Sequence, residues 1–289
     1  MRDLIDIQSN DNALFVTGQC NNHCVMCCQP PVVNDDIDCL YAKNLRLVES
    51  APKELDTIGI TGGEPTLLGD RLFSLLRHIR QHLPDTSIHI LSNGRRFSDE
   101  DFVKDFASAA DGHAIVGIPL HADSPLKHDQ IAGIEGAYNE TMLGLYNLAA
   151  YDIDIELRIV VNKMNYKRLP KMASFISKNL AFVLCVAFMA MEDIGYTIKN
   201  REKIWIEPLE YVSELGKAAS FLAQMEFDVS LYNLPLCLLP CSLHPFARKS
   251  ISDWKNSFVA FCEQCVRKSE CCGLFSTSQK PFYGLTPFM

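Results

Sequence analysis

The sequence predicts an α/β protein with a parallel sheet, either an open sheet or a partial (β/α)6 barrel of the TIM type, with a small irregular cysteine-rich extension at its C-terminal end. Three observations favour this fold. Strand-like apolar runs alternate six times with helix-like segments between residues 13 and 188, at the lengths of βαβ units. These runs are continuously apolar, as strands are when both faces of a parallel sheet are covered. The residues that could bind ligands or take part in catalysis follow these runs, at the strand ends where such folds bind ligands.

Each expected element has a local signal. Strands are expected at residues 13–18, 57–60, 87–91, 114–120, 153–161 and 182–188. Helices are expected at 38–50, 71–83, 99–109, 139–150, 169–180 and 207–225, and loops at 122–137 and 195–203. The clearest helix is 71–83, whose Leu72, Leu75 and Ile79 recur at the helical period on one face.

Composition sets the domain organisation. The chain has 289 residues, of which 48% are hydrophobic and 21% are charged, so it can bury one large domain with an appendage, or two domains. We expect a lead-in over residues 1–12, a barrel domain over 13–229 and a separate cysteine-rich region over 230–289. The net charge of −8, without a long basic run, disfavours sequence-independent nucleic-acid binding.

The cellular compartment is predicted from the absence of a targeting pattern. The first residues are polar and acidic, unlike a signal peptide, and the most apolar window, 180–191, is too short to span a bilayer. We therefore expect a cytoplasmic protein that does not enter a membrane. In that reducing compartment, twelve cysteines indicate metal ligands rather than disulfides.

A cysteine triplet directly after the first apolar run organises the chain. Cys20, Cys24 and Cys27 are so close in sequence that their sulfurs are expected to converge. Thiolates are soft ligands that suit an iron–sulfur cluster or zinc, and a four-iron cubane held by three of them leaves one iron open. One alternative is a structural zinc site completed by His23 or Cys28, which the spacing fits poorly. The other is a set of disulfides, which the crowding disfavours.

A second motif, Gly62–Pro65, ends the second expected strand. Gly62 and Gly63 carry no Cβ, so the backbone there can approach a ligand closely. Glu64 supplies a carboxylate, and Pro65 fixes the turn. The alternative is an ordinary strand-to-helix turn, since two glycines alone are weak evidence for a ligand site. The position of this turn, one strand after the cysteine triplet, favours a ligand site.

With both motifs in this order, residues 13–190 resemble the radical S-adenosylmethionine (radical SAM) enzymes. The resemblance implies that Cys20, Cys24 and Cys27 hold a catalytic 4Fe–4S cluster whose open iron binds S-adenosylmethionine. It further implies that an electron from the cluster splits the sulfonium into methionine and a 5′-deoxyadenosyl radical. That radical would abstract a hydrogen atom from the substrate.

The resemblance also assigns cofactor contacts to residues at matching positions. The Gly62–Pro65 turn would meet the methionine amino group, with Glu64 facing that cation. Met26 stands where the family often places an apolar side chain against the adenine. Ser92 and Asn93 stand where contacts to the ribose or the carboxylate are common.

Two further positions in the expected barrel carry polar groups. Arg158, on the fifth strand, could pair with the methionine carboxylate, because a guanidinium matches a carboxylate bidentately. His121 stands where many relatives of the family carry an aspartate. Its role therefore stays open between a core histidine and a pocket group near the substrate.

A second group of cysteines lies within residues 237–272: Cys237, Cys241, Cys262, Cys265, Cys271 and Cys272. The triplet Cys262, Cys265 and Cys271 with one upstream cysteine makes a closed set of four thiolates, which serves zinc as well as iron. The pattern resembles the cysteine-rich, SPASM-like tail of radical SAM enzymes that modify ribosomally made peptides. In that tail four cysteines bind an auxiliary 4Fe–4S cluster. The resemblance makes Cys237 the upstream ligand and Cys241 and Cys272 extra thiols, either of which could substitute.

Shorter motifs resemble one branch of these enzymes, the radical SAM maturase C of the His-Xaa-Ser peptide system. They are residues 233–237, 245–248, 250–256 and 271–275, together with 24–27 followed by 29–31. This resemblance implies modification of a ribosomally synthesised peptide. The alternatives are a radical SAM enzyme that acts on a small molecule or nucleoside, and a non-catalytic, metal-stabilised interaction module.

The resemblance also implies partners. About a dozen residues precede the first expected strand, too few for a packed domain that grips a leader peptide. We therefore expect a separate protein, such as a second radical SAM maturase, to present the peptide, unless the loops at 122–137 and 195–203 do so. Cleavage of S-adenosylmethionine further requires an electron donor such as flavodoxin or ferredoxin.

Overall fold

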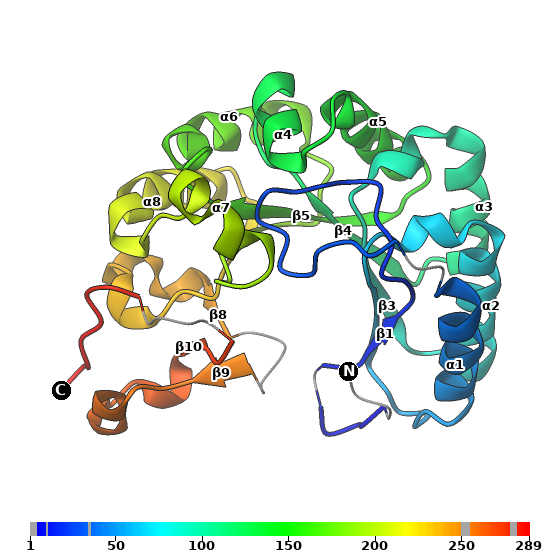
Figure 1. Cartoon of the computed structure of the whole chain (residues 1–289), viewed down its shortest axis with the longest axis horizontal. Helices are drawn as coiled ribbons and strands as arrows, with labels where there is room; N and C mark the ends of the chain where they lie inside the picture. The colour runs from blue at the N-terminus through cyan, green and yellow to red at the C-terminus, as the bar shows by residue number, and fades with distance from the viewer. Residues whose placement is uncertain (1–4, 10, 34–35, 250–254, 278–281) are drawn as a thin grey trace. The chain divides into compact units, whose positions relative to one another are not determined.

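A computed structural model describes residues 5–9, 11–33, 36–249, 255–277 and 282–289. Eight strands, β1 to β8, follow one another in sequence order within one sheet, and β9 and β10 form a separate antiparallel pair (Figure 1). This arrangement confirms the expected α/β fold of the partial TIM type. Residues 250–254 of the motif at 250–256, and residues 1–4 and 10 of the expected lead-in, lie outside the described residues.

The strands and helices have the following bounds. The strands are β1 Ala13–Phe15, β2 Thr57–Thr61, β3 Ser87–Leu91, β4 Ala114–Pro119, β5 Asp154–Val161, β6 Cys185–Ala190, β7 Asp228–Tyr232, β8 Ala247–Arg248, β9 Asn256–Ser257 and β10 Leu274–Phe275. The helices are α1 Ile37–Glu49, α2 Asp70–His82, α3 Glu100–Ala110, α4 Pro125–Ala132, α5 Ala137–Ala150, α6 Leu169–Asn179, α7 Tyr196–Ile204 and α8 Pro208–Gln224.

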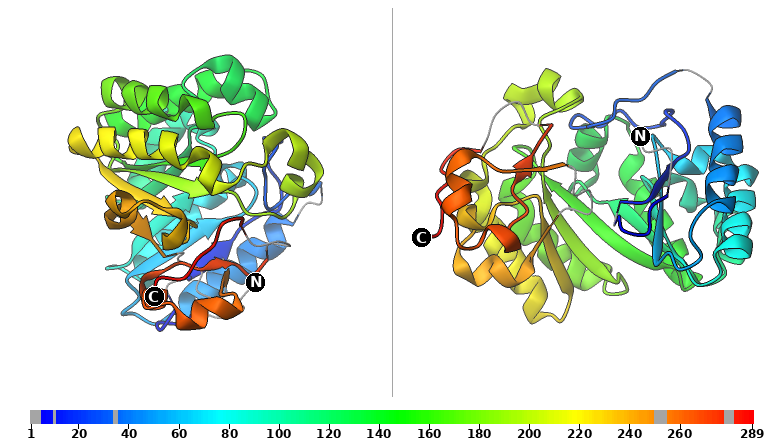
Figure 2. Two further views of the ribbon diagram at one scale, coloured as in Figure 1. Left: turned by 90° about the vertical axis from the view of Figure 1, so that its left-hand side faces the viewer. Right: turned by 90° about the horizontal axis from the view of Figure 1, so that it is seen from below.

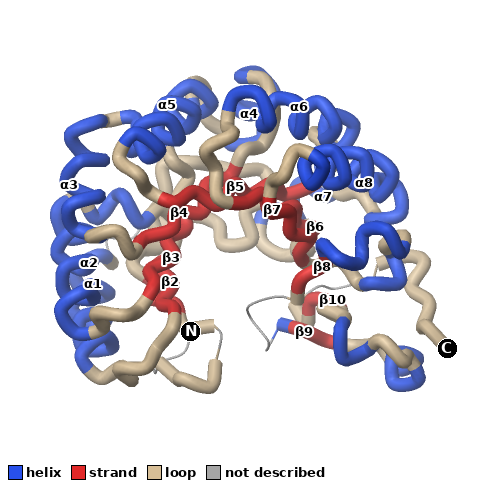
Figure 3. The backbone as a smooth tube through the Cα atoms, turned by 180° about the vertical axis from the view of Figure 1, so that it is seen from behind, coloured by secondary structure: helices blue, strands red, loops and turns tan. Residues whose placement is uncertain are grey.

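The chain divides into two compact units. The first comprises Met1–His23, Gln29–Pro119 and Gly136–Glu156, and the second comprises Cys24–Cys28, Leu120–Glu135 and Leu157–Met289. In the first unit β1, β2, β3 and β4 pair in parallel, each with the next. Helices α1 to α3 form a layer outside these strands (Figure 3). The core between strands and helices is closed by fully buried side chains such as Ile58, Ile88 and Leu75.

The second unit is built on β6, β7 and β8, which also pair in parallel. Helices α6 and α8 pack against each other beside these strands (Figure 2). Their apolar faces bury residues such as Met172 and Leu215, which are fully inaccessible. Within the described residues, none of the helices is both long enough and apolar enough to cross a bilayer.

Two segments expected to be loops contain helices. The segment 122–137 contains α4, which begins at Pro125 and ends at Ala132, followed by Gly133 in the left-handed conformation. The segment 195–203 coincides with α7, which begins after Gly195, whose φ of +60° favours glycine. Both helices are short and largely polar, so they lack the apolar period that reveals a longer helix. The proline at the start of α4 and the glycine after its end were the available signals.

The chain after residue 227 is more regular than expected. β7 extends the sheet, and its residues Val229 and Leu231 are buried. The domain boundary expected at residue 230 falls inside this strand. Neither β7 nor β8 gives a continuous apolar run in the sequence, because Asp228 and Ser230 interrupt the apolar residues of β7, and β8 has only two residues.

Candidate active site

The turn at the end of β2 packs against the backbone that leads into the cysteine loop. The amides of Gly63 and Glu64 donate to the carbonyls of Thr17 and Gln19, at 2.7 and 2.8 Å. A Cβ on Gly63 would lie 2.0 Å from the Gln19 carbonyl oxygen, and one on Gly62 would lie 2.4 Å from that of Thr17. Glycine is therefore required at both positions for contact between the two backbones.

Glu64 is fully buried and joins the ends of β2 and β3. Its Oε1 accepts hydrogen bonds from the Thr66 amide, the Thr66 hydroxyl and the Ser92 hydroxyl, at 3.0, 2.7 and 2.7 Å. Its Oε2 accepts one from the Asn93 amide at 2.7 Å. Burial raises the pKa of Glu64, while these hydrogen bonds lower it. The carboxylate expected to face a bound cation thus has protein donors as its immediate contacts.

The same network reaches the cysteine loop within the first unit. Asn93 Nδ2 donates to Asn21 Oδ1 at 2.6 Å. Arg95 Nη1 donates to the Asn21 carbonyl and to Asn22 Oδ1, at 2.7 and 2.9 Å, while its Nε pairs with Glu140 at 2.5 Å. Sequence reasoning missed Arg95. The sequence feature that could have indicated Arg95 is its position directly after the strand-end residues Asn93 and Gly94, where a side chain can reach a neighbouring loop.

Cys20 lies beside this network. Its sulfur accepts a hydrogen bond from the Asn22 amide at 3.4 Å and interacts with the Asn93 side chain. Burial raises the pKa of Cys20, and the hydrogen bonds and the Arg95 charge act in the opposite direction. The structure therefore brings Cys20, Glu64 and Asn93 into one cluster within the first unit.

In the second unit, Cys24 lies against a buried pair of histidines. His121 Nε2 is 3.9 Å from Cys24 Sγ, and the His121 amide donates to His128 Nδ1 at 3.3 Å. Burial lowers the pKa of His121 well below its usual value and lowers that of His128 to about 4, so both rings are neutral near pH 7. Among the described residues, His121 Nδ1 has no hydrogen-bond partner. Protonation of Nε2, which faces the sulfur, avoids burying an unpaired N–H.

Helix α7 supports residues 24–28 of the cysteine loop. Thr197 Oγ1 donates to the Met26 carbonyl at 3.3 Å, and Asn200 Nδ2 donates to that of Val25 at 2.8 Å. Gly195 precedes the helix with φ +60°, and a Cβ there would lie 2.4 Å from the Cys27 carbonyl oxygen. The segment expected to be a loop is therefore a platform for two of the three cysteines.

Two other expected contact residues lie in the second unit. Met26 is 9% exposed and packs in an apolar cluster with Ile131, Met191 and Ile204. Arg158, on β5, is half-buried, and its Nη2 lies 3.3 Å from the sulfur of Met189 on the neighbouring strand β6.

The C-terminal cysteines surround one cavity. It is lined by Cys237, Cys262, Cys265 and Cys271, with apolar side chains that include Phe258. The amides of Leu236 and Gly273 donate to Cys271 Sγ, and that of Phe288 donates to Cys265 Sγ, each at 3.4 Å. A hydrogen bond from Cys272 is the main cause that lowers the pKa of Cys271 to about 6. Neither Cys241 nor Cys272 lines the cavity.

The spacing of these four sulfurs helps to distinguish a site for a single zinc ion from a site for an iron–sulfur cluster. Sulfurs that bind one tetrahedral zinc at about 2.3 Å lie about 3.8 Å apart. In the part of the chain that the structure describes, the one group of three or more His, Cys, Asp or Glu with ligand atoms all within 4.8 Å of one another lies elsewhere. No three of the cavity cysteines are that close, so their arrangement suits a multi-iron cluster better than a single zinc.

Comparison with known families decides which class of protein this is. Residues 14–176, more than half of the chain, match the model of the radical SAM superfamily. The chain belongs to this superfamily. The matched region contains both the cysteine triplet and the Gly62–Pro65 turn.

Several solved structures share the radical SAM fold of this chain. Streptococcus suis SuiB bound to S-adenosylmethionine superposes with a TM-score of 0.60 and 16% identity, over 76% of this chain and 49% of that one. Native anSMEcpe with bound AdoMet and a Kp18Cys peptide gives 0.57 and 19%, over 72% and 58%. The Fe-coproporphyrin III synthase of Methanosarcina barkeri is 22% identical over 197 residues, 65% of this chain. The chain spans 46% of that relative and about half of SuiB.

The donor set of this radical SAM protein fits the cofactors that its family implies. Cys20, Cys24 and Cys27 are partly exposed thiols, and none of them is tied up in a disulfide. In the first unit a buried hydrogen-bond network holds the loop at Asn21. In the second unit helix α7 holds it at Met26. Three thiolates in a held loop are suitable ligands for a 4Fe–4S cluster.

Proposed function

We propose that this chain cleaves S-adenosylmethionine reductively at a 4Fe–4S cluster held by Cys20, Cys24 and Cys27, and modifies a ribosomally synthesised peptide. The observation that carries the proposal is the cysteine triplet within the family match, with its loop packed on the Gly62–Pro65 turn. When bound, the cluster supplies the electron that splits the sulfonium and yields the 5′-deoxyadenosyl radical. The chain's own residues bind and orient the nucleotide.

The burial of Glu64 refines its proposed role. Because its carboxylate has no exposed surface, we propose that the backbone carbonyls of the Gly62–Pro65 turn receive the methionine amino group. Glu64 then holds that turn against Ser92 and Asn93 from behind. Those two residues would contact the ribose or the carboxylate of the nucleotide.

Met26, Arg158 and His121 also have proposed roles. Met26 would meet the adenine through the edge of its buried side chain. Arg158 would pair with the methionine carboxylate, because a guanidinium matches a carboxylate bidentately. His121 would act through Cys24 rather than on the nucleotide, since its Nε2 faces that sulfur.

The cavity lined by Cys237, Cys262, Cys265 and Cys271 would hold a second, auxiliary 4Fe–4S cluster. Four thiolates, a wider spacing than zinc requires and amide donors on two sulfurs support this assignment. Together with the motifs shared with the His-Xaa-Ser maturase, this SPASM-like feature supports a peptide substrate.

Solved neighbours also support a peptide substrate. SuiB is known in complex with its precursor peptide SuiA, with a TM-score of 0.57 and 14% identity over 74% of this chain and 46% of that one. The anSMEcpe structure contains a bound peptide. We further propose a cytoplasmic location, which keeps the thiols reduced, an electron donor such as flavodoxin or ferredoxin, and a separate protein or second maturase that presents the peptide.

A small-molecule substrate is the second candidate, favoured by the similarity to Fe-coproporphyrin III synthase. The two are separated by incubating the reduced, cluster-loaded chain with S-adenosylmethionine and deuterated substrates. The proposal predicts deuterium in 5′-deoxyadenosine and a mass change in a His-Xaa-Ser peptide. Transfer from a porphyrin precursor, with none from the peptide, would favour the second candidate.

A further inference from the structure

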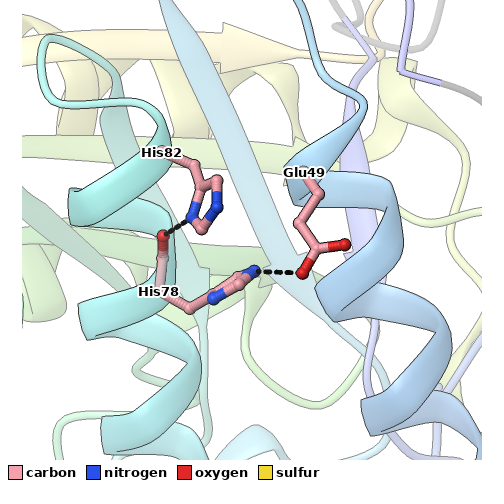
Figure 4. A group of neighbouring side chains, drawn as sticks. All are labelled: Glu49, His78 and His82. Atoms are coloured by element: carbon pink, nitrogen blue, oxygen red, sulfur yellow. Dashed lines mark hydrogen bonds and ion pairs between the residues drawn. The ribbon is translucent and has the colours of Figure 1, made fainter.

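A group of side chains far in sequence from the C-terminal cysteines joins helices α1 and α2 of the first unit. Glu49 is the last residue of α1, and His78 and His82 lie one turn apart near the end of α2 (Figure 4). One ligand atom of each lies within 4.8 Å of the other two. Two imidazoles and a carboxylate at this spacing are a ligand set for a first-row divalent metal.

The hydrogen bonds of His82 select the nitrogen that is available. His82 Nδ1 lies 3.0 Å from the His78 carbonyl oxygen. A carbonyl can only accept, so Nδ1 carries the proton, and Nε2 of the neutral ring keeps its lone pair. Metal-binding histidines commonly donate their other N–H in this way, because the bond fixes the ring and raises the basicity of the ligand nitrogen.

The distance between His78 and Glu49 suits an ion better than a direct bond. His78 Nε2 lies 3.6 Å from Glu49 Oε1, which is too long for a hydrogen bond, and 3.3 Å from the Leu45 carbonyl oxygen, to which it donates in the metal-free chain. A metal bound at Nε2 would displace that proton, as metal binding to histidine commonly does. Two ligand atoms at about 2.1 Å from one tetrahedral zinc lie about 3.4 Å apart. The side chains are 18% and 53% exposed, so an ion and its waters have access from solvent.

The position at two helix ends adds an electrostatic preference for cations. Glu49 ends α1 and His82 ends α2, and the C-terminal end of a helix carries partial negative charge. A cation already uses this feature, since Lys53 Nζ donates to the His82 carbonyl at 2.6 Å. That contact engages the backbone and leaves the imidazole free of the lysine.

We propose that Glu49, His78 and His82 form a divalent transition-metal site, with zinc the best match and water in the remaining position. The site is chemically distinct from the cysteine sites, because its donors are nitrogen and oxygen rather than sulfur. Bound metal would fasten the end of α1 to the end of α2, the helix that follows the Gly62–Pro65 turn.

Equilibrium dialysis of the tag-free, cluster-loaded chain against zinc tests this proposal. We compare the unaltered chain with the double variant His78→Ala/His82→Ala and with the control His113→Ala, whose histidine lies outside the group. The unaltered chain and the control bind one zinc per molecule more than the double variant. Glu49→Gln weakens zinc binding by about tenfold or more, since even outer-shell changes cost that much.

Equal zinc binding by the unaltered chain and the double variant would overturn the proposal. Iron measured in the same samples shows that the clusters are intact, so a failure of the proposed radical chemistry does not affect the result. Should the double variant not fold, Glu49→Gln, a change on an exposed helix end, decides the question. Unchanged zinc affinity in that variant overturns the site.

Discussion

His121 is the residue whose role the sequence left open and whose contacts now suggest one. Its ring is 2% exposed and places Nε2 at 3.9 Å from Cys24 Sγ. Hydrogen bonds to cluster sulfurs raise the reduction potential, because they stabilise the more negative reduced state. We expect His121→Phe to lower the potential of the first cluster, measured by a redox titration followed by electron paramagnetic resonance.

The conservative variant His121→Gln is the control for that experiment, because its amide keeps an N–H donor. It should restore part of the potential. A His121→Phe chain with an unchanged potential would show that the histidine only fills space.

His128 predicts a pH dependence of stability. Its pKa is about 4 in the folded chain, against 6.5 when unfolded. Between these values the unfolded chain binds a proton that the folded chain does not, so stability falls as the pH falls. When the pH falls from 7.5 to 5, this histidine lowers the free energy of unfolding by about 2 kcal/mol. Chemical unfolding should show a loss that is about 2 kcal/mol larger in the unaltered chain than in His128→Gln, which keeps the contribution of His121. Equal losses in both would contradict the assignment.

At the scale of elements, the turn after β2 depends on close backbone contact. Gly63→Ala would place a Cβ 2.0 Å from the Gln19 carbonyl oxygen and push the cysteine loop away. We expect it to cost at least about 1–3 kcal/mol and to reduce iron loading. Gly69→Ala is the matched control, because its Cβ would meet no atom within 4 Å. Its only cost is the backbone strain of a non-glycine residue at φ +56°. Equal iron loading in both variants would show that the contact is dispensable.

The elements that the sequence predicted are those with long apolar periods. The strand at residues 87–91 and the helix at 71–83 were found within a residue, because each buries a regular face. The helices α4 and α7 were missed because they are short and polar, and their stability comes from contacts such as that of Thr197 with Met26. Tertiary contacts of this kind leave no periodic pattern in the sequence.

At the scale of the whole molecule, the motif residues were predictable and their supports were not. The cysteines and the Gly62–Pro65 turn have fixed spacings, which the sequence shows directly. Arg95 and the burial of Glu64 depend on which strand ends are neighbours, so they became visible in the structure. The cavity that Cys237 lines and Cys241 does not is likewise visible only in the structure.

The cavity cysteines predict how iron content divides over the chain. Cys237→Ser or Cys271→Ser removes a ligand of the second cluster, so about four irons of about eight should be lost after anaerobic reconstitution. Cys241→Ser is the control, because that exposed thiol does not line the cavity and should leave the iron content unchanged. Loss of iron in the control, with none in Cys271→Ser, would show that Cys241 rather than Cys271 is a ligand.

The central claim is that Cys20, Cys24 and Cys27 hold the cluster that cleaves S-adenosylmethionine. The most direct measurement is 5′-deoxyadenosine formed by the reduced, reconstituted chain under anaerobic conditions. The account predicts product from the unaltered chain and from the control Cys39→Ala, whose exposed thiol lies on α1. It predicts none from a variant with alanine at all three positions, which keeps about four irons. Product from that variant, or none from a fully loaded unaltered chain, would contradict it.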